Sequence, residues 1–74
     1  MKERTFGRAT RFQVVRAELE SLAHRLGPHG KFPPMREMAE RFGAGINTLA
    51  GALDDLEARE VVYRRHGVGV FVSP

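Results

Sequence analysis

The sequence predicts a small α+β domain in which three helices precede a two-stranded β-hairpin. Apolar residues recur at spacings of three and four over most of the chain, which is the period of an amphipathic helix. After residue 60 the pattern changes to short runs of β-branched and aromatic residues, which favour strands. Glycine and proline residues separate these segments and mark the turns between them.

The first predicted helix follows Thr10 and ends at Gly27-Pro28. Thr10-Arg11-Phe12-Gln13 matches a capping box, in which the threonine accepts a hydrogen bond from the first turn and the glutamine reaches back. The apolar stripe of this helix has helical spacing and consists of Phe12, Val15, Leu19, Leu22, Ala23 and Leu26. Residues 1–9 have no apolar period, so we expect a flexible basic arm there and a single domain over residues 10–74.

A loop with several glycines and prolines comes next, and its one large apolar side chain, Phe32, is expected in the core. The second helix is predicted from a stripe formed by Met35, Met38, Ala39 and Phe42. Pro34 is tolerated at its first position, and Gly43 is placed to end it as a left-handed cap.

Only Ala44 and Gly45 separate this helix from a third one. Two short helices across a tight, glycine-containing turn are typical of a helix-turn-helix, and an ordinary helical hairpin is the alternative. The stripe of the third helix consists of Leu49, Ala52, Leu53 and Leu56.

The last segment predicts a β-hairpin. Residues 61–65 and 70–72 form its strands, and His66-Gly67-Val68-Gly69 forms its turn. A lone hairpin is marginally stable in water, so we expect it to lie against the helices. Six residues are expected in the core as a set: Phe12, Leu19, Leu22, Leu53, Leu56 and Phe71.

Composition argues against several classes of function. The 74 residues fit one domain and leave little volume for a buried catalytic site. The chain has no cysteine, and its three histidines (His24, His29 and His66) lack metal-ligand spacing. No nucleophile–base pair, phosphate-binding loop or dinucleotide-binding glycine pattern occurs. We therefore expect no enzymatic activity, no cofactor and no metal, and we expect a cytoplasmic protein without membrane contact.

Positive charge is concentrated at the two ends of the chain. Residues 1–16 contain five basic side chains and one acidic side chain, residues 17–63 contain five basic and eight acidic ones, and Arg64 and Arg65 follow. This separation favours a polyanionic partner, with a solvated basic tail as the alternative. Ten of the twelve basic residues are arginines, whose forked side chain fits phosphates and base edges.

The order of helix, helix-turn-helix and arginine-bearing hairpin is that of a winged helix. Residues 32–43, Phe-Pro-Pro-Met-Arg-Glu-Met-Ala-Glu-Arg-Phe-Gly, resemble the loop and second helix of GntR-type bacterial regulators. The resemblance covers about residues 12–72, and it continues in register through Leu49, Ala52-Leu53, Leu56-Glu57, Val61-Val62, Arg64-Arg65, Gly67, Gly69 and Phe71-Val72.

This resemblance implies a function in transcription regulation. It implies sequence-specific binding of double-stranded DNA, with the third helix in the major groove and the hairpin, or wing, near the minor groove. Regulators of this type normally carry a further domain that binds a metabolite and dimerises. We therefore expect no small-molecule effector site in this chain, a possible homodimer on DNA, and a location at the bacterial nucleoid.

The resemblance also assigns DNA-contacting positions. It places Arg36 at the start of the second helix, Thr48 early in the third, and His66 with Gly67 at the wing tip. Arg64 and Arg65 lie on alternate faces of the first wing strand, so one of them is expected to face DNA. For Arg36, an ion pair with Glu40 is the alternative role.

The start of the third helix departs from the family pattern. Gly45-Ile46-Asn47-Thr48 stands where serine-arginine-threonine-threonine is usual, and Ala50 stands where an arginine is usual. The recognition surface is therefore small and nearly neutral. Asn47 could pair with adenine, and Ile46 or Ala50 could touch thymine methyl groups, which predicts a preference for A·T pairs. The same neutral patch supports the alternative function, a winged helix that binds protein or a second copy of itself.

Gly51 is the other departure in this helix. A glycine there costs roughly 1 kcal/mol of helix stability relative to alanine, which predicts a close approach of DNA or of a partner helix.

Overall fold

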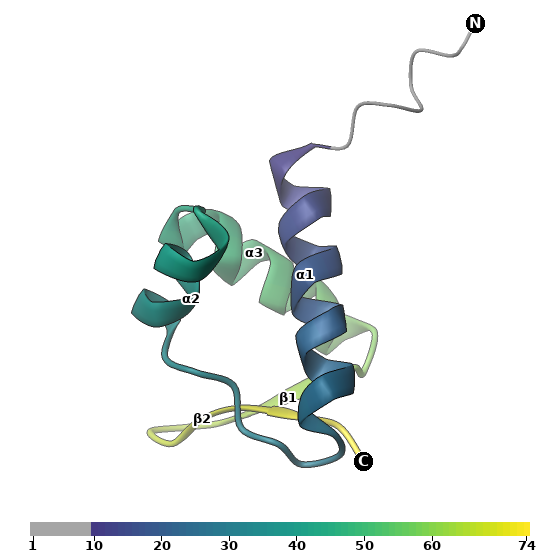
Figure 1. The fold of residues 1–74 in the computed structure, drawn as a ribbon. Coiled ribbons are helices and arrows are strands. Elements are labelled where there is room, and N and C mark those ends of the chain that lie inside the picture. Colours follow the sequence, from purple (N-terminus) through teal and green to yellow (C-terminus); the bar gives the residue numbers. More distant parts are fainter. Residues whose placement is uncertain (1–9) are drawn as a thin grey trace, which may run out of the picture.

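The computed structural model describes residues 10–74, which form three helices and a β-hairpin in the predicted order (Figure 1). The basic arm predicted for residues 1–9 lies outside the described residues. The elements are α1 (Arg11–Leu26), α2 (Met35–Phe42), α3 (Ile46–Ala58), β1 (Val62–Arg65) and β2 (Gly69–Val72). Within residues 10–74, no helix combines the length and the apolar character needed to cross a membrane.

The predicted helix ends are confirmed with one change. Thr10 and Gln13 form a complete capping box, in which each backbone N–H donates to the other residue's side chain over 3.0 Å. Gly43 ends α2 in the left-handed conformation, with φ 62° and ψ 38°. Pro34 is the residue before the first helical position, which Met35 occupies, because α2 begins one residue later than expected.

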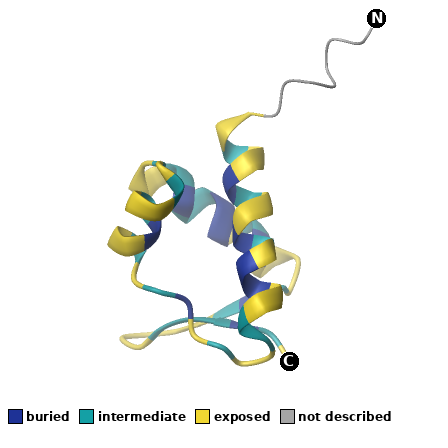
Figure 2. Cartoon of the chain, viewed as in Figure 1, coloured by how far each residue is buried: buried dark blue, intermediate teal, exposed yellow. Residues whose placement is uncertain are grey.

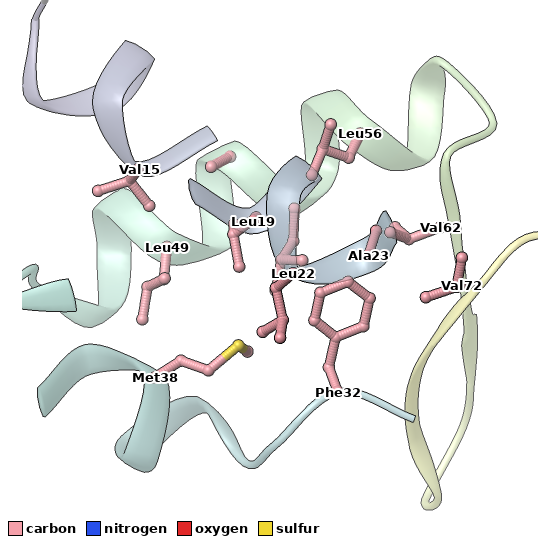
Figure 3. Packing of buried hydrophobic residues seen from close by; sticks show 12 residues of the cluster. Val15, Leu19, Leu22, Ala23, Phe32, Met38, Leu49, Leu56, Val62 and Val72 are labelled. Atoms are coloured by element: carbon pink, nitrogen blue, oxygen red, sulfur yellow. The ribbon is translucent and has the colours of Figure 1, made fainter. Parts of the chain in front are cut away.

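The core lies where α1 and α3 face each other, and α2 and the hairpin close it from the sides (Figure 3). In α3, Leu49, Leu53 and Leu56 are fully buried. Phe32 is 3% exposed, which confirms its predicted place. The buried apolar residues are Val15, Leu19, Leu22, Ala23, Phe32, Met38, Leu49, Ala52, Leu53, Leu56, Val62 and Val72. Burying one leucine side chain contributes about 1.5–3 kcal/mol, so this cluster dominates the stability of the domain.

The prediction that Phe71 lies in the core is wrong. Antiparallel pairing joins Val62 to Val72 and Tyr63 to Phe71. Because side chains alternate between the faces of a strand, the first pair faces the helices and the second faces away. Phe71 instead stacks on Tyr63, with ring centroids 5.5 Å apart and planes at 17°. Phe12, also expected in the core, is partly buried at its edge.

The loop before α2 is paired with the hairpin, which the sequence did not predict. The Phe32 N–H donates to the Val70 carbonyl at 2.9 Å, and the Val72 N–H donates to the Gly30 carbonyl at 2.8 Å. Lys31 and Phe71 form a β-bridge between them. The loop therefore acts as a short third edge that fixes the hairpin relative to α2.

Candidate nucleic-acid interface

Three elements meet on one side of the molecule. Figure 1 shows α2, the start of α3 and the turn between β1 and β2 together at the left of the view, and the side chains of Met35 and Val68 line one groove between α2 and this turn. We call this side the candidate interface. These elements and the residues next to them contain most of the positions that the sequence assigned to DNA: Arg36 in α2, Gly45, Ile46, Asn47, Thr48 and Ala50 at the start of α3, and Arg65, His66 and Gly67 at the wing turn.

The start of α3 is exposed and uncharged. Gly45, Ile46 and Asn47 are exposed, whereas Thr48 and Ala50 are half-buried. Ile46 is 49% exposed, although it is a large apolar residue. At the wing tip, Val68 is 51% exposed, so the candidate interface presents two apolar side chains to solvent.

Gly51 lies on the side of α3 that faces α1. A Cβ atom built on it would stand 3.6 Å from Cε1 and 3.9 Å from Cδ1 of Phe12, which is ordinary van der Waals contact. Within residues 10–74, nothing approaches this position closely enough to require a glycine, because the space would accept an alanine.

The N-termini of α2 and α3 have free amide groups. The residues before them, Pro34 and Gly45, provide no side-chain hydrogen bond to the first turn. Amide groups of this kind, at the positive end of the helix dipole, attract anions. Arg36 lies in the first turn of α2, and it has no ion pair within residues 10–74: Glu37 instead pairs with Arg41 at 3.3 Å. The alternative pairing of Arg36 with Glu40 is thus not formed.

The two wing arginines have different surroundings. Nη1 of Arg64 donates to Oδ1 of Asp54 at 2.8 Å and to Oε1 of Glu57 at 2.7 Å, so its charge is held against α3. Arg65, on the other face of β1, is exposed and forms no ion pair with any described residue. Of the two, Arg65 is the side chain available to an external anion.

The wing tip is a tight turn. The Val68 N–H donates to the Arg65 carbonyl at 2.9 Å, and Gly67 has a φ of 76°, a conformation that favours glycine. His66 is exposed beside it. At the wing tip, the exposed backbone of Gly67 therefore lies next to the exposed imidazole of His66.

Lys31 is a basic residue of this side that the sequence did not indicate. It comes from the loop before α2, and its Cε lies 3.1 Å from the position that a Cβ on Gly69 would occupy. Its stem therefore crosses the wing next to the residue paired with Arg65. Lys31 is exposed and has no carboxylate partner in the described part of the chain. The loop that contains Lys31 is rich in glycine and proline, so its sequence does not predict the β-bridge with Phe71 that brings Lys31 to the wing.

Several arginines elsewhere on the described chain are bound within the fold. Oδ2 of Asp55 accepts from Arg16 of α1 at 3.1 Å and from Arg59 at 2.9 Å. The hydrogen bond from Arg16, assisted by the charge of Arg59, lowers the pKa of Asp55 below its usual 3.8, and partial desolvation opposes this shift. Nη1 of Arg11 donates to the Gly43 carbonyl at 3.1 Å, which ties α1 to the turn between α2 and α3.

The chain is similar to known DNA-binding domains. A model of the gntR family of bacterial regulatory proteins matches residues 12–72. The AraR DNA-binding domain, solved in complex with operator ORX1, is 26% identical, with a TM-score of 0.82 over 89% of this chain and 82% of that one. The N-terminal domain of AraR, solved in complex with mutant ORR3, is also 26% identical, with a TM-score of 0.83 over 89% and 97% of the two chains.

A longer protein has the same fold. YydK of Bacillus subtilis, described as a possible transcriptional regulator, is 24% identical, with a TM-score of 0.80 over 89% of this chain and 30% of its own. The match of the family model over residues 12–72 covers most of the sequence, and the three helices and the wing have the arrangement of these domains. The chain belongs to the GntR family of bacterial regulatory proteins.

Proposed function

We propose that this chain is the double-stranded DNA-binding domain of a transcription regulator, with α3 in the major groove and the wing tip at the adjacent minor groove. One observation carries the geometry. On the candidate interface, Arg36, Arg65 and Lys31 are without carboxylate partners among residues 10–74, whereas most arginines elsewhere on the described surface are paired. The complexes of the AraR domain with its operators support the same function.

The phosphate contacts follow from charge and helix geometry. The uncapped first turn of α2 directs its amides and Arg36 toward one phosphate, as helix N-termini do toward anions. Arg65 and Lys31 flank Gly69 and reach phosphates beside the minor groove. Thr48 and the amides after Gly45 contact the backbone at the entrance of α3. His66 and Gly67 approach the minor groove through the turn.

Base recognition rests on neutral side chains. Asn47 is exposed in the first turn of α3 and has the two-ended amide that pairs with adenine. Ile46 and Ala50 contact thymine methyl groups, which explains why an apolar side chain is exposed at the start of α3. We therefore expect a site rich in A·T pairs. Selection from a random duplex library tests this, and a G·C-rich core contacted by α3 would contradict it.

The function is tested by fluorescence anisotropy on a labelled random-sequence duplex over a salt series. Binding through phosphates predicts an affinity that falls with salt, and Arg36→Ala should reduce the slope of log K against log salt by about 0.9. Arg25→Ala is the matched control, because Arg25 is also exposed, is unpaired within residues 10–74 and lies in the last turn of α1. Equal effects of the two variants would contradict the proposed orientation.

Self-association is the alternative function, and the exposure of Ile46 and Val68 favours it. Sedimentation of the free chain distinguishes the two. A salt-insensitive dimer that does not bind duplex, and that dissociates in Ile46→Ser, would replace DNA binding as the conclusion. A chain that stays monomeric alone and binds duplex supports the proposed function.

We further propose that two copies act together on DNA in the bacterial cytoplasm. One winged helix covers a half-site, and regulators gain affinity by occupying two half-sites. On a duplex with two selected sites, a doubly bound band that forms with little accumulation of the singly bound band in a mobility-shift titration tests this. Independent binding of the two copies would contradict the pairing.

A further inference from the structure

Arg64 lies between two carboxylates of the helix that we propose enters DNA. A single nitrogen, Nη1, donates to Asp54 at 2.8 Å and to Glu57 at 2.7 Å. The side chain of Arg64 is 37% exposed, and it projects from the same face of β1 as the buried Val62. The ion pairs therefore connect the wing to α3 at the surface, beside the core.

The carboxylates belong to the surface of α3 that carries the base-reading residues. Asn47, Ala50 and Asp54 are three and four residues apart, so they form one ridge along the helix. Asp54 follows Asn47 by two turns, a rise of about 10 Å. When the start of α3 lies in the major groove, this end of the ridge lies near the phosphates at the groove edge. Unpaired carboxylates there repel DNA.

We propose that Arg64 is a positioning residue for DNA binding that holds the wing against α3 and masks Asp54 and Glu57, and that it makes no phosphate contact itself. This inference rests on the proposed DNA-binding function. It divides the work of the two neighbouring arginines: Arg64 is used inside the domain, and Arg65, on the opposite face of β1, contacts DNA. The wing strand therefore has two arginines, but only one of them is available to bind a phosphate.

The test compares variants of equal charge. Arg64→Gln and Arg65→Gln each remove one positive charge and keep most of the side-chain stem. Each is made in the wild-type chain and in a chain that also carries Asp54→Asn and Glu57→Gln. The two triple variants have the same formal charge, so long-range electrostatics cannot distinguish them. Affinity for a labelled duplex is measured by anisotropy at fixed salt, and thermal unfolding checks the fold of each variant.

The proposal predicts rescue at one position only. Arg64→Gln alone weakens binding on the order of fivefold, because two carboxylates then face the phosphates. The triple variant that contains Arg64→Gln recovers most of the lost affinity, because no unpaired carboxylate then faces the phosphates, although the contact between the wing and α3 is still absent. The triple variant that contains Arg65→Gln binds about tenfold more weakly than its partner, because a charge-assisted contact to DNA is lost. This last comparison leaves no carboxylate unpaired, so it holds even if Arg64→Gln alone lowers the unfolding midpoint.

Two results overturn the proposal, and they differ from a failure of the function. Equal affinities of the two triple variants would contradict the different roles of Arg64 and Arg65, and weaker binding by the one with Arg64→Gln would show that Arg64 contacts DNA itself. In either case the wild-type chain still binds duplex, and the proposed function stands. If the wild-type chain binds no duplex at low salt, the proposed function fails, and this inference fails with it.

Discussion

Arginines have different surroundings in two regions of the molecule: the contact between α1 and α3, which we call the seam, and the candidate interface. In the seam, Arg16 and Arg59 share the carboxylate of Asp55, and Arg11 donates to the Gly43 carbonyl. On the candidate interface, Arg36 and Arg65 have no carboxylate partner among the described residues. Figure 2 shows that the two regions also differ in burial: the facing sides of α1 and α3 contain buried residues, drawn dark blue, and the wing tip is exposed. On the wing, pairing distinguishes the two neighbouring arginines: Arg64 is held by two carboxylates of α3, whereas Arg65 has no carboxylate partner within residues 10–74.

The largest expected effect comes from the core that both regions share. Leu53 is fully buried in α3, and Leu53→Ala should lower the free energy of unfolding by about 2–5 kcal/mol, because it leaves a cavity. Urea denaturation followed by circular dichroism measures this. Val14→Ala is the control, since Val14 is 42% exposed on α1, and it should change stability by about 0.5 kcal/mol or less. Equal losses in the two variants would contradict the described packing.

Replacing one arginine of each region by alanine separates effects on DNA affinity from effects on stability. Arg36→Ala should weaken duplex binding about tenfold and leave the unfolding midpoint unchanged, because it removes only an external contact. Arg16→Ala should leave affinity nearly unchanged and lower stability by at most about 1 kcal/mol, because its ion pair with Asp55 is partly exposed. Anisotropy and urea denaturation on both variants check this. The distinction between the regions fails if Arg16→Ala is the variant that loses binding.

A substitution at Gly51 tests how closely α3 packs against α1. Gly51→Ala should raise the free energy of unfolding by roughly 1 kcal/mol, because alanine is the better helix former and its methyl group meets Phe12 at a normal distance. Duplex affinity should not change. The thermal unfolding midpoint measures the first effect. A lower midpoint would show that α1 and α3 pack more closely here than described.

The smallest expected effect is the pH dependence of the seam. The pKa of Asp55 is lower in the folded chain than in the unfolded chain, so the unfolded chain binds a proton first as the pH falls. The stabilisation from Asp55 is therefore complete above its unfolded pKa of 3.8 and is lost as the pH falls toward the folded pKa. Urea midpoints of the wild type and Asp55→Asn at several acidic pH values measure this. The two curves should converge as the pH falls, and parallel curves would contradict the assignment.

The helices and the hairpin were predictable because local signals agree with the fold. The capping box at Thr10, the glycine at position 43 and the period-three-and-four stripes each encode an element without reference to the rest of the chain. Phe71 shows where such reasoning ends. Val70 and Phe71 are both apolar, and the register with β1 decides which of them faces the core.

The candidate interface was predictable in outline but not in its charges. The sequence pointed to Arg36 and to the start of α3, which lie on one side of the molecule. It could not rank Arg64 against Arg65, because the partners of Arg64 come from α3, seven and ten residues away. Lys31 was missed for a similar reason, since only the β-bridge to Phe71 brings it beside the wing.

The most direct test of the central claim is a titration of the isotope-labelled chain with duplex DNA, followed by amide chemical shifts at low salt. Binding through the candidate interface predicts large shifts at Arg36, at Ile46 and Asn47, and at the wing tip around Gly67. The exposed face of α1, around Glu18 and Ser21, should stay unchanged. Shifts confined to α1, or no shifts at any duplex concentration, would contradict the claim that this surface binds DNA.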